Sequence, residues 1–159
     1  MLSTSAPSTQ THDATANEML LIRVEHELYA LTSATVREVS RYRTITPVPG
    51  APRMLPGVIS QRGMIVPVVD LRLILGLALA DVTRATRLVL VSAEQVDIAL
   101  LVDEVIDLQA LPMNRVEPPP AALDPAQARL LKGVIQHDGQ PIALLDLQSL
   151  IAMLREVTA

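Results

Sequence analysis

The sequence predicts a mainly β protein built from two similar small β-barrels rather than from a doubly wound sheet. Three observations favour this fold class. Short runs of branched apolar residues are separated by frequent turn signals, few segments show helical spacing, and one stretch of the chain occurs twice. The 159 residues are enough for one ordinary domain, or for two small units that share a core.

The repeat pairs residues 57–72 with residues 133–148. The two segments align without a gap: each starts with Gly-Val-Ile, carries a second glycine, and ends in Asp-Leu before one more residue. Each copy is typical of a strand, a tight turn, a second strand and a short helix. Two copies are too few for a solenoid, which needs at least about three, so the repeat indicates two similar β-subdomains.

The N-terminal third begins with residues 1–17, which are polar and rich in Ser and Thr. This is typical of a disordered tail and not of a signal peptide, which needs a charged start and an apolar run. Residues 19–24 and 28–31 predict a strand hairpin, and residues 36–39 continue the sheet or form a short turn of helix. Residues 46–56 are rich in proline, which predicts an irregular loop.

The first copy of the repeat predicts strands at residues 57–60 and 65–69. Asp70 is a favourable N-cap for a short helix reaching Leu75, because its carboxylate can accept hydrogen bonds from free backbone N–H groups. Gly76 is the residue type favoured just past a helix end.

The middle of the chain adds two more strand segments. Residues 88–91 are uniformly apolar, which predicts a central strand buried on both faces. Residues 96–110 alternate with a period of two, and Glu104 interrupts the apolar row, so we expect a bulge or a chain turn there. One face carries Val96, Ile98, Leu100, Val102, Ile106, Leu108 and Ala110.

The C-terminal part predicts two helices around the second copy of the repeat. Asp124 before Pro125 looks like an N-cap followed by proline at the first helical position, with the helix ending near Leu131. Asp146 opens the second helix. Its apolar positions at helical spacing are Leu147, Leu150, Ile151 and Leu154.

Composition argues against several classes of function. The net charge of −4 and the near absence of aromatic residues disfavour binding to nucleic acid. There is no cysteine, and His12, His26 and His137 belong to no ligand motif, so we predict no metal site and no cofactor. The lack of cysteine suits a reducing cytoplasm, where we expect the protein to lie, and no apolar run reaches the ~18 residues of a spanning helix, so we expect no direct membrane insertion.

An enzymatic alternative would use Asp70 and Asp146, because paired carboxylates from two lobes can share a proton. Both residues precede an apolar helix, however, and neither has the Asp-Thr-Gly or Asp-Ser-Gly context of two-lobed aspartic proteases. A phosphate-binding loop and a nucleophile elbow are also missing. We interpret both residues as helix caps and predict no enzymatic activity.

The two copies of the repeat differ at one turn. The second has Asp138-Gly139, which suits a tight hairpin turn, whereas the first has Arg62-Gly63. Arginine is a poor choice if both turn residues need a positive φ. A local departure from turn preference is where function is expected, so Arg62 is a candidate functional residue.

The ordered set of motifs over residues 18–155 resembles the CheW family. The motifs are Tyr29-Ala-Leu, Val36-Arg-Glu-Val39, Thr46-Pro-Val-Pro-Gly-Ala-Pro52, the segment Gly57 to Arg72, Leu101-Val-Asp-Glu-Val105, Pro118-Pro119 and Gly133-Val-Ile. The usual family sequence before Arg-Gly is Asn-Leu, which is Ser60-Gln61 here, and the family's strand phenylalanines are absent.

The resemblance implies one CheW-like domain over residues 18–156, made of two five-stranded SH3-like barrels around a shared core. It implies an adaptor that binds the cytoplasmic tip of chemoreceptors and the regulatory domain of a CheA-type histidine kinase. The partner-binding residues it implies are Arg62, Val36, Glu38, Val39, Gly57, Val58, Ile59 and Gly63. A chemosensory pathway linked to pili or surface sensing is an alternative.

We further hypothesise that an apolar groove between the barrels takes a receptor helix, with Arg62 at its rim. The same groove could instead hold a small hydrophobic ligand, and the sequence does not separate these two occupants.

Overall fold

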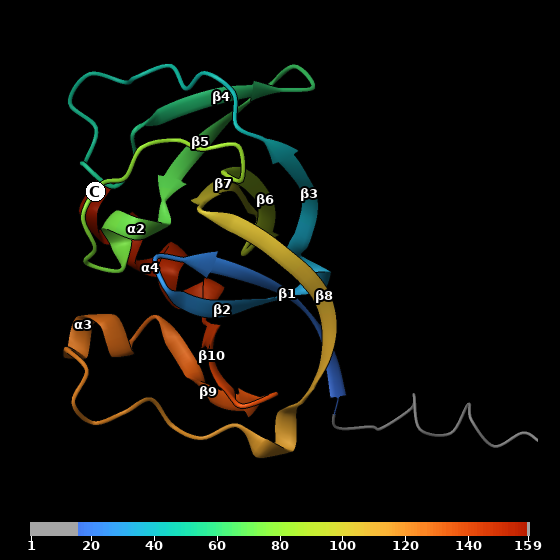
Figure 1. The fold of residues 1–159 in the computed structure, drawn as a ribbon. Coiled ribbons are helices and arrows are strands. Elements are labelled where there is room, and N and C mark those ends of the chain that lie inside the picture. Colours follow the sequence, from blue (N-terminus) through green and yellow to red (C-terminus); the bar gives the residue numbers. More distant parts are fainter. Residues whose placement is uncertain (1–15, 159) are drawn as a thin grey trace, which may run out of the picture.

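The computed structural model describes residues 16–158, which form two curled five-stranded sheets with a few short helices (Figure 1). Barrel 1 contains β1 (Ala16–Val24), β2 (Glu27–Thr32), β8 (Glu104–Pro112), β9 (Leu131–His137) and β10 (Gln140–Leu145). Barrel 2 contains β3 (Val36–Arg41), β4 (Gly57–Gln61), β5 (Met64–Asp70), β6 (Arg87–Ala93) and β7 (Val96–Val102). The predicted fold class is confirmed.

The helices are α2 (Leu71–Ile74), α3 (Pro125–Ala128) and α4 (Leu147–Thr158), with 3-10 turns η1 (Ser33–Thr35) and η2 (Met113–Arg115). Asp70 caps α2, because its carboxylate accepts a hydrogen bond from the backbone N–H of Arg72 at 3.0 Å. Asp146 does the same for α4 through the N–H of Ser149 at 3.1 Å. Both predicted caps are therefore confirmed.

Each barrel combines strands from both halves of the chain. The strand order is β8-β1-β2-β10-β9 in barrel 1 and β3-β6-β7-β5-β4 in barrel 2. The β1–β2 hairpin thus pairs in parallel with β10 from the C-terminal copy, and the β6–β7 hairpin pairs in parallel with β5 from the first copy. Barrel 2 is one continuous stretch of the chain from β3 to β7, whereas barrel 1 joins the N-terminal β1–β2 hairpin to β8, β9 and β10, and each barrel contains the hairpin of one copy of the repeat.

The two copies of the repeat occupy equivalent places. In barrel 2 the chain after β3 bridges to β4, where Thr46 and Val58 exchange two backbone hydrogen bonds of 2.9 Å. In barrel 1 the chain after β8 bridges to β9, where Glu117 and Val134 exchange two of 2.8 Å. Each barrel is closed by the connector that precedes its last hairpin.

One apolar cluster fills the space between the barrels. It draws on both sheets, and α4 lies at its centre, between barrel 1 and barrel 2 (Figure 1). The buried residues of α4 are Leu147, Leu150, Ile151 and Leu154, as the helical spacing predicted. The α4 side chain of Gln148 also donates to Glu94, in the β6–β7 turn, at 3.2 Å.

Some predicted boundaries are wrong. Strand β1 starts at Ala16, inside the predicted tail, and the rest of that tail lies outside the described residues. Helix α3 ends at Ala128, before Leu131, and Asp124 makes no side-chain capping bond, although Pro125 opens the helix as expected.

The expected interruption near Glu104 is present, because β7 ends at Val102 and β8 begins at Glu104. Beyond that break the apolar face turns outward: Ile106 and Leu108 are 40% and 51% exposed. The period of two is real, but in β8 the apolar face is not a core face, because β8 is an edge strand.

Candidate partner-binding site

The β4–β5 turn places Arg62 in a backbone conformation that arginine rarely adopts. Its φ is 51° and that of Gly63 is 80°, almost the same as 52° and 77° at Asp138 and Gly139 in the equivalent β9–β10 turn. Both turn residues therefore need a positive φ, as in the tight hairpin turns that favour Asn, Asp and Gly. Arg62 is the residue that the turn does not favour.

A polar network holds this turn against β3. The Arg62 guanidinium donates to Glu38 at 3.2 Å, and the Gln61 amide donates to the same carboxylate oxygen at 2.8 Å. Arg43, just past β3, donates to the side-chain oxygen of Gln61. Because β3 and β4 are the two edges of the barrel 2 sheet, the network joins these edges and fixes the direction of Arg62, whose side chain is 81% exposed.

Exposed apolar side chains lie on the same hairpin as Arg62 and on edge strand β3. Met64 and Ile65 on β5 are 60% and 67% exposed, and Val39 on β3 is 40% exposed. Arg62 and Met64 also line a hollow of about 340 Å³ whose floor includes core residues such as Ile98. Arginine next to exposed apolar side chains is the composition found at the centre of protein interfaces.

The other predicted partner-binding residues are placed less favourably. Gly57 is buried, and a side chain there would collide with the backbone oxygen of Thr46. Ile59 is only 3% exposed, and Val58 pairs with the connector. We therefore correct the expectation of direct partner contact for Gly57 and Ile59: they position the hairpin that presents Arg62 and Gly63.

The hypothesis of an open groove between the barrels is wrong for this structure. The shared apolar cluster fills that space. At its edge lies a depression of about 200 Å³, lined by residues of both barrels such as Leu31 of β2 and Ala93 of β6. Arg62 is not part of it, and it is too small for a helix about 10 Å across.

Comparison with known proteins identifies the family. The model of the CheW-like domain matches residues 18–155. This chain belongs to the CheW-like family. A crystal structure of the scaffolding protein TtCheW from Thermoanaerobacter tengcongensis superimposes with a TM-score of 0.76 and 27% sequence identity, covering 82% of this chain and 89% of that one.

Two curated relatives cover a similar share. The chemotaxis protein CheW of Rhizobium meliloti is 29% identical over 83% of this chain and 85% of its own. The protein FrzA of Myxococcus xanthus is 32% identical over 87% and 88%. The CheW-like family is a family of non-enzymatic chemotaxis scaffolds and adaptors. Across residues 16–158, no helix has the length and apolar character needed to cross a membrane.

The two aspartates weighed as catalytic groups act locally in this CheW-like chain. Burial raises the pKa of Asp70 above its ordinary value, and hydrogen bonds from the backbone N–H groups of Arg72 and Leu73 offset this only in part. Each aspartate binds the N-terminus of its own helix. This supports the interpretation of both as structural caps.

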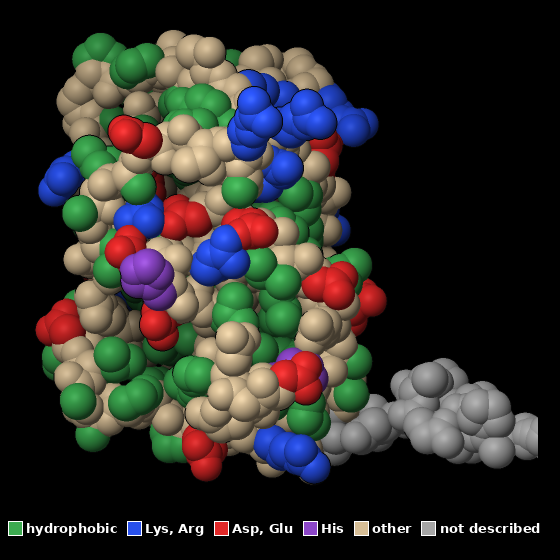
Figure 2. All heavy atoms as spheres, in the orientation of Figure 1, with side chains coloured by type: hydrophobic (Ala, Val, Ile, Leu, Met, Phe, Trp, Pro, Cys, Tyr) green, Lys and Arg blue, Asp and Glu red, His purple; other side chains and the backbone are tan. Residues whose placement is uncertain are grey.

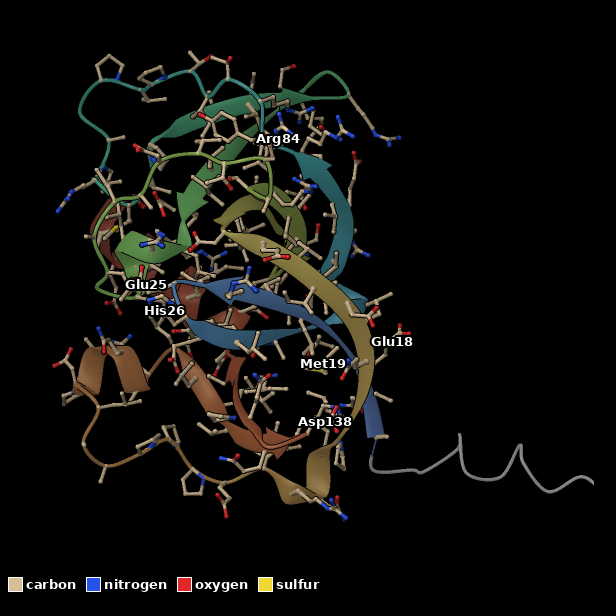
Figure 3. All side chains as sticks on the ribbon, viewed as in Figure 1. Glu18, Met19, Glu25, His26, Arg84 and Asp138 are labelled. Atoms are coloured by element: carbon tan, nitrogen blue, oxygen red, sulfur yellow. The ribbon has the colours of Figure 1, made fainter. Side chains whose placement is uncertain are left out.

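An ion cluster between the barrels was not predicted. Arg72 on α2 donates to both carboxylate oxygens of Asp103, at 2.9 and 2.7 Å, and pairs with Glu25 of the β1–β2 turn at 2.6 Å. The Arg72 side chain is only 15% exposed. Figure 3 shows Glu25 beside α2, at the end of the β1–β2 hairpin.

Asp103 is the centre of this cluster. Burial favours a higher pKa for its carboxyl, but the hydrogen bonds from Arg72 and from the Glu25 backbone N–H outweigh it and hold the pKa below its ordinary value. The cluster therefore favours the charged form and ties barrel 1 to barrel 2. Its members lie far apart in the sequence: 78 residues separate Glu25 from Asp103.

Proposed function

We propose that this CheW-like protein is an adaptor that couples chemoreceptors to a CheA-type histidine kinase. It binds the cytoplasmic tip of the receptors and the regulatory domain of the kinase, and it works in the cytoplasm, within receptor arrays at the inner membrane. Family membership supports the scaffold role. The observation that carries the proposal is the Arg62 turn. The backbone of Arg62 has an unfavourable positive φ, and its exposed guanidinium belongs to a hairpin that also exposes apolar residues.

An adaptor needs rigidly placed contact groups and no reacting group. Glu38 accepts a hydrogen bond from Arg62 and is itself held by Gln61, so a partner carboxylate meets a guanidinium that is already oriented. At an open rim such an ion pair contributes under about 1 kcal/mol. When the partner covers Met64 and Ile65 and excludes water, an arginine anchor contributes about 2 kcal/mol, or roughly thirtyfold in affinity. Many such contacts in an array add up through multivalency.

The test is calorimetric titration of the protein with the CheA-type kinase of the same organism, and separately with a receptor cytoplasmic fragment. We expect stoichiometric binding of the kinase that is lost when its CheW-like regulatory domain is deleted. Arg62→Ala should weaken binding of one of these partners roughly tenfold or more. The matched control is Asp138→Ala, which alters the equivalent turn of the other barrel.

Two results would count against the proposal. If Arg62→Ala and Asp138→Ala weaken both partners equally, the Arg62 turn has no special role in binding. If folded protein binds neither partner, the adaptor role in that pathway fails. Kinases of other chemosensory pathways, such as those linked to pili, are then titrated next, because FrzA shows that the family extends beyond proteins named CheW.

A further inference from the structure

A second basic surface adjoins the Arg62 network and is not explained by it. A pocket of about 460 Å³ lies between the end of β3 and the start of β6, and its lining includes Arg41, Tyr42, Thr83, Arg84 and Arg87. Figure 2 shows Lys and Arg side chains gathered at the upper right of the molecule, and Figure 3 places Arg84 in this region.

The arginines of this pocket repel one another. Arg41 and Arg87 are direct partners in the antiparallel β3–β6 ladder, and like charges placed directly opposite are destabilising. Among residues 16–158, none of the three pocket arginines forms an ion pair with an acidic side chain. This local concentration of positive charge lies on a chain whose net charge is −4, so it is not a general property of the surface.

The loop before β6 is built so that the charges stay together. Arg87 donates to the backbone oxygens of Arg84 and Thr86, at 2.7 and 2.9 Å. The loop is further fixed by Thr83 and Thr86, since the Thr83 N–H donates to the Thr86 hydroxyl at 2.8 Å. Arg84 and Arg41 are both exposed, and their guanidinium groups have no described acidic partner.

We propose that this pocket binds the phosphate groups of a soluble nucleotide. Guanidinium groups match phosphate oxygens with two parallel hydrogen bonds, and a bound dianion removes the repulsion between Arg41 and Arg87. The volume lies within the range of small-ligand sites. Tyr42, one of only two aromatic residues in the chain, lines the same pocket and offers a ring on which a base can stack.

The site is distinct from the surface proposed for the kinase and receptors. Arg62 does not line this pocket, and Arg41, Arg84 and Arg87 take no part in the network of Glu38 and Gln61. The proposal can therefore be correct or wrong whatever the outcome of the adaptor experiments.

The experiment is calorimetric titration of the full chain with pyrophosphate, with ATP and GTP, and with adenosine as the phosphate-free control. We expect pyrophosphate and at least one nucleotide to bind with one-to-one stoichiometry, and adenosine not to bind. Arg84→Ala and Arg41→Ala should each weaken binding about tenfold, since each removes a charge-assisted contact. Arg115→Ala is the matched control, because Arg115 is an exposed arginine on η2, outside the pocket.

Thermal unfolding provides a second measurement. Saturating pyrophosphate should raise the midpoint of the wild-type protein and of Arg115→Ala equally, and that of Arg84→Ala by clearly less. Arg84 is an exposed loop residue, so its variant should remain folded without ligand.

Three results would overturn the proposal. The first is no binding of any phosphate compound at millimolar concentration. The second is equal weakening by Arg84→Ala and Arg115→Ala, which would show diffuse attraction rather than a site. The third is binding to anionic vesicles, or to a polyglutamate peptide, without binding to nucleotides, which would assign the pocket to a lipid surface or to an acidic protein segment.

Discussion

Asp103→Asn is expected to destabilise the protein by removing the charge that joins the two barrels. In the wild-type protein, the Asp103 carboxylate accepts two hydrogen bonds from Arg72 and a third from the Glu25 backbone N–H at 2.8 Å. Asparagine keeps the shape and can place its one oxygen where Oδ2 had accepted two hydrogen bonds, but its NH₂ group then faces the Arg72 Nε–H that had donated to Oδ1. One hydrogen bond is therefore lost, and the other two no longer have a charged acceptor.

The magnitude follows from the burial of the pair. A hydrogen bond to a charged group contributes about 1.5–3 kcal/mol. The Asp103 side chain is 28% exposed and Glu25 still neutralises Arg72, so we reduce the sum to about 2–3 kcal/mol. With a urea m-value near 2 kcal/mol per molar, the midpoint of urea unfolding should fall by roughly 1–1.5 M. Asp107→Asn is a suitable control, because Asp107 is an exposed aspartate on β8.

The difference between wild type and variant should depend on pH. The folded-state pKa of Asp103 is lowered, so its contribution is fully present above the unfolded-state pKa of about 3.9 and is lost as the pH falls through the folded-state value. The difference should therefore be large at pH 7 and clearly smaller near pH 3. A difference under about 0.5 kcal/mol at pH 7, or one that does not shrink in acid, would refute the role assigned to this cluster.

Five further substitutions at four positions test the turn, one cap and the repeat, each by urea unfolding. Arg62→Asn should stabilise the fold by about 0.5 kcal/mol, because relief of the positive-φ strain exceeds the loss of an exposed ion pair. The same variant should weaken partner binding. A variant less stable than wild type would contradict the strain argument. Asp70→Asn should be at least as stable as wild type at pH 7, because the raised pKa of Asp70 means that its charged form costs stability there. Asp70→Ala should lose about 1 kcal/mol of stability, because it removes the cap. Equal loss in both variants would reject the charge argument. Gly57→Ala should lower the stability by about 2 kcal/mol, since the new Cβ meets the Thr46 backbone. Gly63→Ala has open space around the new Cβ but a φ of 80°, so it should lower the stability by nearer 1 kcal/mol. Equal losses would argue against a steric role for Gly57.

Features set by local chemistry could be predicted from the sequence. The hairpins, the two aspartate caps and the buried face of α4 each depend on residues within a few positions of one another, and all are present. Comparison of the two copies of one turn marked Arg62 as a poor fit if the turn needs a positive φ, and its φ is 51°. These are the cases in which a short segment and the whole fold impose the same conformation.

Features set by tertiary arrangement could not be predicted in the same way. The burial pattern of β8 depends on its position at a sheet edge, which periodicity does not reveal, so Ile106 and Leu108 gave a true alternation on an exposed face. The cluster of Arg72, Asp103 and Glu25 joins residues from three distant segments. Each of these looked like an ordinary surface charge in sequence. The only available signal was that Arg72 ends the first copy of the repeat, where the second copy has Gln148.

The common framework of the two repeated hairpins explains how a duplicated fold can carry one specialised surface. Each barrel contains the hairpin of one copy, and both copies keep the same framework: a glycine under the connector, a tight turn, and an aspartate cap. What can differ is the exposed side chain at the turn, because its conformation is set by the framework around it. At Asp138 the side chain suits the turn, whereas at Arg62 it does not. The exposed ion pair with Glu38 contributes little to stability, so the partner contact proposed above accounts for the arginine better than the fold does.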